Sequence, residues 1–220
     1  GALDFKESTS LDNAGLYRLL ADASLTCTDG GSVINNGGTF QKYSSTGVST
    51  IQPLFSNQGL IDARSGTIRL SGGSDLYDSS ATVYSRARLD FTGGNHEVHG
   101  RFAVSGAGSS ALYTNLVADF GATTEFNLDG GFHFVDGTIS GTGTVLNKGV
   151  ADWTNGLVAE NGTLRNDGTL TILAGTNRGL RRGHLLTLGT VNHQEGDLDV
   201  DERSTLEIAA SGTYNLMNDR

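Results

Sequence analysis

Residues 129–175 read DGGFHFVDGTISGTGTVLNKGVADWTNGLVAENGTLRNDGTLTILAG, and this stretch decides the fold. Two series of glycines recur in it every 19 positions: Gly130, Gly149 and Gly168, and then Gly137, Gly156 and Gly175. Short apolar segments recur between the glycines with the same period. A fixed period near 20 residues, with three apolar segments in each period, is typical of a chain that winds as a β-solenoid.

Residues 19 positions apart in this stretch have matching character, as stacked coils require. Two apolar columns flank a polar one: Phe132, Ala151 and Leu170; Phe134, Trp153 and Ile172; and, between them, His133, Asp152 and Thr171. Alternation with a period of two predicts strands and excludes a helix, in which each interior glycine would cost about 1 kcal/mol. A further column of Leu128, Asn147 and Asn166 predicts asparagine amides that hydrogen-bond along the stack at a corner.

The composition agrees with a chain that is mostly hydrogen-bonded sheet. The 220 residues include 32 glycines and a single proline, Pro53. Because proline cannot donate to a ladder of strands and glycine suits sharp bends, we expect Pro53 at an edge or corner of the coil. The length is enough to bury a substantial core and requires only one domain, residues 1–220.

Charge and cysteine content exclude several classes of function. With 24 acidic and 15 basic side chains the net charge is −9, which repels phosphate backbones, so we expect no nucleic-acid partner. No apolar run approaches the roughly 18 residues of a membrane span, so we expect no membrane insertion. Cys27 is the only cysteine, which precludes an internal disulfide and predicts a small buried hydrophobic residue.

The same pattern recurs upstream with a period of 21 residues. Residues 34–40 and 55–61 align their asparagines, glycines and apolar ends. Between about residues 76 and 125 alternation still predicts strands, but the glycines are too sparse to fix the register. Residues 176–183, TNRGLRRG, form the only basic cluster, and we expect a loop that protrudes from the solenoid and exposes Arg181 and Arg182.

A longer repeat is indicated near the two ends of the chain. Residues 15–19, GLYRL, match residues 212–216, GTYNL, and each segment is followed three residues later by an aspartate, Asp22 and Asp219. The offset is 197 residues. We therefore expect one large unit, residues 15–211, with the next copy starting near residue 212, and a chain that belongs to a longer tandem array.

Several stretches resemble the repeats of very large secreted bacterial surface proteins. These are residues 36–42 (NGGTFQK), 66–73 (GTIRLSGG), 136–144 (DGTISGTGT) and 189–193 (GTVNH). The chain is similar here to autotransporter passengers and filamentous-haemagglutinin-like adhesins, whose stalks are right-handed parallel β-helices. The resemblance implies secretion to an extracellular or cell-surface location, and its motifs carry no catalytic residues.

These patterns together predict an all-β fold, a right-handed parallel β-helix (β-solenoid) of roughly ten coils with about 19–21 residues in each. Right-handedness rests on the general preference of parallel crossovers and on the resemblance, because the spacing alone does not fix it. Each coil adds about 4.8 Å, so ten coils give a rod of about 50 Å.

The best local candidate for chemistry is the alternation of Asp197, Asp199 and Asp201 with two apolar residues. Alternation places the three carboxylates on one side of a strand, about 7 Å apart. That separation suits an inverting glycosidase or a weak calcium site, but an exposed acidic face also explains it and is our main interpretation. We therefore predict no catalytic residues, no metal and no cofactor, with calcium at these aspartates as the alternative.

The other conspicuous residues complete no catalytic motif. His96 and His99 fall on opposite faces of a strand, and Glu97 between them does not complete an HExxH zinc motif, so we expect scattered surface histidines. No GxSxG, P-loop or dinucleotide fingerprint occurs. Trp153 would suit sugar stacking if exposed, but its apolar column predicts a core position.

The sequence therefore predicts a non-catalytic structural or adhesive segment of an extracellular bacterial fibre. The expected partners are neighbouring solenoid repeats, or further copies stacked end to end because uncapped coils expose strand edges, and surface glycans. The alternative is a carbohydrate-active module, either a glycan-binding domain or a polysaccharide lyase or glycoside hydrolase, with its site near Asp199 or near Arg181 and Arg182. Ice or mineral binding is disfavoured because the threonines do not form a flat lattice.

Overall fold

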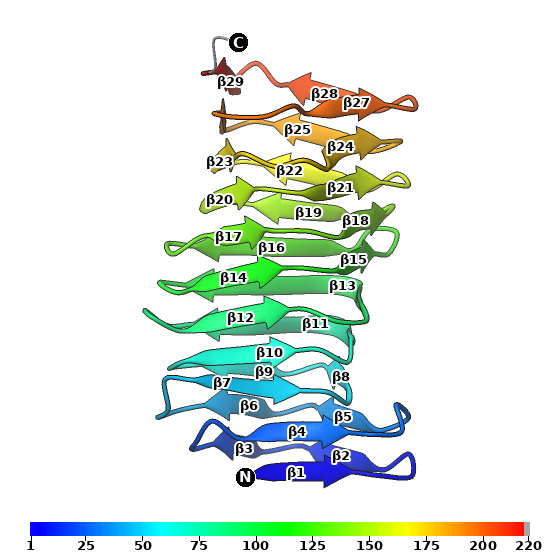
Figure 1. Ribbon diagram of the computed structural model, residues 1–220, viewed down its shortest axis with the longest axis vertical. Helices are drawn as coiled ribbons and strands as arrows, with labels where there is room; N and C mark the ends of the chain where they lie inside the picture. The colour runs from blue at the N-terminus through cyan, green and yellow to red at the C-terminus, as the bar shows by residue number, and fades with distance from the viewer. Residues whose placement is uncertain (218–220) are drawn as a thin grey trace.

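The computed structural model describes residues 1–217 and shows a parallel β-solenoid, which confirms the predicted fold class (Figure 1). The described residues form 29 short strands that stack from the N-terminus at one end of a rod to the C-terminus at the other. Every strand pair is parallel. Eleven strands on the first face mark ten successive coils and the start of the next.

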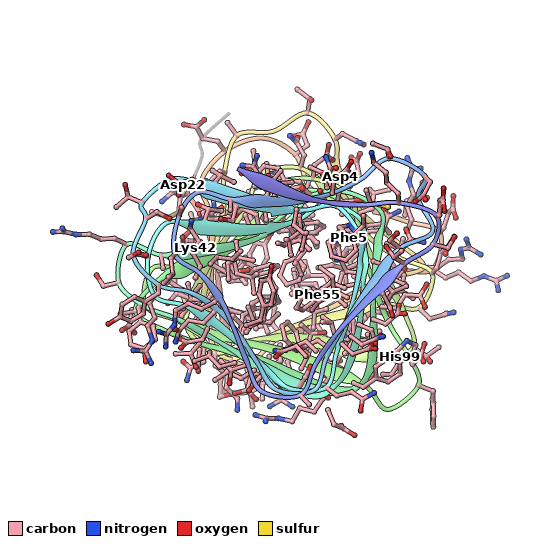
Figure 2. All side chains as sticks on the ribbon, turned by 90° about the horizontal axis from the view of Figure 1, so that it is seen from below. Asp4, Phe5, Asp22, Lys42, Phe55 and His99 are labelled. Atoms are coloured by element: carbon pink, nitrogen blue, oxygen red, sulfur yellow. The ribbon has the colours of Figure 1, made fainter. Side chains whose placement is uncertain are left out.

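Each coil has three faces, which Figure 2 shows end-on. The first face is one eleven-stranded sheet. Its strands are β1 (Ala2–Phe5), β4 (Ser24–Cys27), β7 (Val48–Ile51), β10 (Thr67–Leu70), β12 (Arg88–Phe91), β14 (Ser109–Leu112), β17 (Phe132–Phe134), β20 (Val150–Trp153), β23 (Thr169–Ile172), β26 (Thr190–His193) and β29 (Thr213–Leu216).

The second and third faces follow in each coil after a corner. The second face holds β2 (Ser10–Asn13), β5 (Val33–Asn36), β8 (Leu54–Asn57), β15 (Asn115–Ala118), β18 (Thr138–Gly141), β21 (Gly156–Ala159), β24 (Arg178–Arg181) and β27 (Asp199–Asp201). The third face holds β3 (Leu16–Leu19), β6 (Thr39–Lys42), β9 (Leu60–Ala63), β16 (Thr123–Leu128), β19 (Thr144–Asn147), β22 (Thr163–Asn166), β25 (His184–Thr187) and β28 (Thr205–Ile208).

Two longer strands continue across the corner between the second and third faces. They are β11 (Ser74–Val83) and β13 (Asn95–Gly106). Their first halves pair with second-face strands and their second halves with third-face strands. The register between them shifts after Tyr77, where Asp78 has a φ of 38°. These strands fill the region in which sparse glycines left the register undetermined by sequence.

The predicted columns are confirmed for the first face. Phe134, Trp153 and Ile172 are aligned in consecutive coils, and the apolar and polar columns beside them align in the same way. One predicted alignment is wrong, because Asn147 lies over Phe126 and not over Leu128. Phe132 follows Phe126 by six residues, whereas Ala151 follows the aligned Asn147 by only four, so the 19-residue period does not extend back across this corner.

The interior of the rod is a continuous apolar core. Phe5 and Phe55 point into it in the end-on view of Figure 2. Trp153 is fully buried, as predicted, and its ring stacks on that of Phe134 with centroids 5.4 Å apart. Burial of each large apolar side chain stabilises the fold by about 1.5–3 kcal/mol, so the stability of the rod accumulates coil by coil.

Asparagine ladders line one corner of the coil, as the pair Asn147 and Asn166 predicts. The amide of Asn147 donates to the side-chain oxygen of Asn166 at 2.8 Å. An upstream ladder runs through Asn13, Asn36 and Asn57, with amide contacts of 2.6 and 2.7 Å. These buried amides also donate to backbone carbonyls at the turn, so they satisfy groups that the bend removes from the strand ladder.

The predicted basic loop over residues 176–183 is wrong, because residues 178–181 form strand β24. The side chain of Arg178 is buried, and it donates to the carbonyls of Thr154 at 3.0 Å and Asp197 at 2.7 Å, among others. A buried cation that closes a corner by capping carbonyl oxygens cannot be distinguished by sequence from an exposed basic residue. Arg181 and Arg182 are exposed, as expected.

Three single-residue predictions have different outcomes. Pro53 lies at the corner between β7 and β8, as predicted. Cys27 is only half-buried, and its thiol donates to Asp29 at 3.2 Å near the N-terminal end of the rod. His96 is fully buried rather than on the surface, and its Nδ1 lies 2.8 Å from the hydroxyl of Ser74. His96 and His99 do lie on opposite faces of β13.

The two segments that suggested a 197-residue repeat occupy different faces of the coil. Residues 16–19 form β3 on the third face, whereas residues 213–216 form β29 on the first. The match therefore does not correspond to one position of the coil. Asp219, which was part of it, lies outside the described residues.

Candidate functional site

The outward-facing side of the second face carries a column of residues whose character changes along the rod. Neighbouring coils present, in order, Asp12, Asn35, Ser56, Asp75, Glu97, Val117 and Ser140, and further along Ala159, Arg181 and Asp201. Acidic residues therefore occupy the middle of this column, and small residues follow. Near the C-terminal end Arg181 aligns with Asp201 in the next coil. Successive members are about 4.8 Å apart along the axis.

A shallow groove of about 480 Å³ lies over the small residues of this face. It extends from β13 to the turn after β27, and its length over five coil steps is about 24 Å. Its floor and walls are mostly polar and small, including Asn95, Asn115, Thr138 and Ser140. Such a groove fits an extended chain that lies parallel to the rod axis better than it fits a compact small molecule.

The C-terminal end of the groove is charged. Arg182 lies between two carboxylates, with its guanidinium 4.0 Å from Glu160 and 3.6 Å from Glu202. Arg181 aligns with Asp201 in the next coil. The two arginines that the sequence singled out therefore both line the groove, although they lie at the end of a strand and in the turn after it rather than in a protruding loop.

The predicted acidic run is only partly a strand. Asp199 and Asp201 lie on β27 and are exposed, whereas Asp197 precedes the strand and its backbone carbonyl accepts from the buried Arg178. Within residues 1–217 none of these aspartates belongs to a group of three acidic, histidine or cysteine side chains whose ligand atoms lie within 4.8 Å of one another. The described geometry therefore gives the calcium alternative no converging ligand set here.

The converging group lies on β11 and β13, beyond the N-terminal end of the groove, where Glu97 aligns with the groove residue Val117. It consists of Asp75, Glu97 and His99, each half-buried. His99 Nε2 lies 3.8 Å from Glu97 Oε2, and His99 Nδ1 lies 2.5 Å from Asp119 Oδ2. The imidazole also stacks on Tyr77, with ring centroids 4.6 Å apart. Figure 2 places His99 on the outside of the coil.

Sequence reasoning missed this group because its members belong to different coils. Glu97 and His99 are two residues apart and therefore share a face of β13, which is the one local signal. Asp75 aligns with Glu97 only through the register of β11 with β13, and that register shifts a few residues later. No constant period would have aligned them.

Comparison with known protein families, with curated proteins and with solved structures finds no match to this chain. The fold class therefore rests on the strand register alone. Residues 1–217 contain no helix with the length and apolar character needed to cross a membrane.

Proposed function

We propose that this chain is a non-catalytic structural and adhesive segment of an extracellular or cell-surface bacterial fibre. In this function the stacked coils supply length and stiffness, and the polar second face supplies contact with surface glycans along the axis. A right-handed rod of about 50 Å per ten coils is expected. The main observation behind the proposal is the exposure of apolar side chains at the two end coils.

Both described ends expose side chains that belong to core columns. Leu3 aligns with the buried Leu25, yet it is 48% exposed. Leu216 aligns with the buried His193 and is 77% exposed. Within residues 1–217, β1 and β29 each pair on one side only, and the open edge of a parallel strand is a template for further pairing. The surfaces therefore support stacking against another coil, either a neighbouring repeat or a second copy of this chain.

The size of the particles in solution tests this proposal. Small-angle scattering and sedimentation velocity over a concentration series should show rods that lengthen in steps of about 50 Å. Leu3→Lys and Leu216→Lys place a charge in the stacking surface and should shift the population to single rods. Val150→Lys, at a 46% exposed position on the first face away from the ends, is the matched control and should assemble like the wild type.

Two results would count against end-to-end stacking. One is a single rod at every concentration. The other is assembly that survives both end variants but is lost in the Val150→Lys control, because this would place the contact on the side of the rod.

A carbohydrate-active module is the second candidate, and the groove on the second face is the observation that favours it. Its polar floor and the paired charges around Arg181 and Arg182 suit the hydroxyl and carboxylate groups of a polysaccharide. Binding to immobilised glycans should fall in Arg181→Ala but not in Arg165→Ala, which removes an arginine from the third face. Cleavage of a polysaccharide that is lost in Asp199→Ala would establish an enzyme and contradict the non-catalytic proposal.

A further inference from the structure

The acidic column on the second face has no lysine or arginine partner at its centre. Asp75 and Glu97 are aligned in adjacent coils, and like charges directly opposite each other on a sheet are destabilising. Within residues 1–217 neither carboxylate has a lysine or arginine nitrogen within 4.0 Å. The basic side chain that lies beside both carboxylates is the imidazole of His99.

Three other carboxylates on the faces of the rod form ion pairs with arginine or lysine. Asp62 pairs with Arg64 at 2.9 Å, and Glu125 is held by Lys148 at 3.1 Å and by an arginine at 3.3 Å. Asp90 pairs with two arginines. These three carboxylates are therefore neutralised by arginine or lysine, whereas the two aligned carboxylates of Asp75 and Glu97 share only the imidazole of His99.

The positions of the ligand atoms fit a bound cation. One ligand atom from each of Asp75, Glu97 and His99 lies within 4.8 Å of the other two. The 3.8 Å between His99 Nε2 and Glu97 Oε2 is too long for a hydrogen bond. It is close to the separation of about 3.4 Å that two ligands have around a tetrahedral zinc ion with bonds of about 2.1 Å.

A hydrogen bond at the nitrogen that would not bind the metal orients the imidazole, as in metal sites of proteins. Asp119 Oδ2 lies 2.5 Å from His99 Nδ1, so Nδ1–H donates to that carboxylate and the lone pair of Nε2 faces Glu97. Tyr77 stacks on the ring with an angle of 18° between the planes. Both contacts fix the ring in the orientation that a metal ligand needs.

We propose that Asp75, Glu97 and His99 bind one divalent transition-metal ion, with zinc as the best fit, and that Asp119 is a positioning residue for His99. A nitrogen ligand beside two carboxylates favours zinc over calcium, which prefers oxygen ligands only. The ion bridges β11 and β13 next to the shift in their register. It therefore links two coils where the ladder is interrupted.

Calorimetric titration of the whole 220-residue chain with zinc chloride tests this proposal. We expect a single site, weakened by at least about tenfold in His99→Ala and by about tenfold in Asp119→Asn. His133→Ala is the matched control and should leave the affinity unchanged. It removes an imidazole that also bonds to a carboxylate, Asp152 at 2.6 Å, but belongs to no converging group of three.

A second readout does not depend on the variants. Zinc should raise the melting temperature of the wild type, because it binds the folded state, and it should shift the Nε2 signal of His99 in nitrogen NMR spectra. If His99→Ala does not fold by circular dichroism, Glu97→Gln replaces it. Absence of zinc binding overturns the proposal, and so does binding that survives His99→Ala and Glu97→Gln or that equimolar calcium displaces.

Discussion

Acidification should destabilise this rod through one buried histidine. His96 is fully buried beside Phe91, and its Nδ1 shares a hydrogen bond with Ser74. Burial lowers the pKa of His96 from its ordinary 6.5 to about 3, because the interior disfavours the charged imidazolium. The folded protein therefore holds this imidazole neutral at pH values at which the unfolded chain would protonate it.

The sign and size of the effect follow from this pKa difference. Between pH 6.5 and about 3 the unfolded chain binds one more proton than the folded chain, so the stability from this group is complete above pH 6.5 and falls as the pH falls. The loss is about 2 kcal/mol at pH 5 and levels off at about 5 kcal/mol below pH 3. A loss of 2 kcal/mol corresponds to about 4–8 °C in melting temperature for a chain of this size.

Urea unfolding and thermal melts at about pH 7.5 and about pH 5 measure the effect. His96→Asn removes the titrating group, and its amide can still bond to Ser74. This variant should be less stable than the wild type near neutral pH but should lose about 2 kcal/mol less on acidification. His133→Asn, which removes a half-exposed imidazole from the first face, should keep the wild-type loss.

Carboxylates also contribute to acid sensitivity, so the comparison between variants is needed to show whether His96 is the group responsible. If the wild type and His96→Asn lose the same free energy between the two pH values, His96 is not the group responsible. If His133→Asn is the variant that becomes insensitive, the titrating histidine lies on the surface and the assigned burial is wrong.

Three further changes test the packing. Trp153→Ala should cost about 3–5 kcal/mol in urea unfolding because it leaves a cavity in the core, whereas Val150→Ala on the same strand should cost under about 1 kcal/mol. Asn36→Ala should cost about 1–3 kcal/mol in the same assay, since it leaves the amides of its ladder without a partner. Gly175→Ala should prevent native folding, judged by circular dichroism, because the added Cβ would lie 1.8 Å from a backbone carbonyl oxygen; Gly15→Ala meets no atom within 4 Å and should be neutral.

Local repetition explains why so much of the fold could be predicted. Between residues 130 and 172 the column of Phe134, Trp153 and Ile172 is visible in the sequence because the consecutive coils have equal length. The prediction failed where a corner changes length, as at Leu128. It also failed at Arg178, because its role depends on carbonyl groups that come from other coils and carry no sequence signature.

The candidate sites were predicted less well, for the same reason. Arg181 and Arg182 were identified as the only basic cluster, and they do line the groove. The acidic run at Asp199 was identified from simple alternation, but alternation decides only the side of a strand and not whether side chains converge. The group of Glu97 and His99 needs a partner 22 residues away across a shifted register, which alternation cannot supply.

The sequence by itself determined that the chain is a stack of parallel strands with an apolar interior, because period, glycine placement and alternation are local properties that each coil repeats. Only the tertiary structure decided which surface residues meet. Contacts such as those of Asp75 with His99, or of Arg178 with the carbonyls it caps, depend on the summed lengths of the corners between coils. These lengths vary, so the offset between aligned residues is 22 for Asp75 and Glu97 but 19 for Phe134 and Trp153.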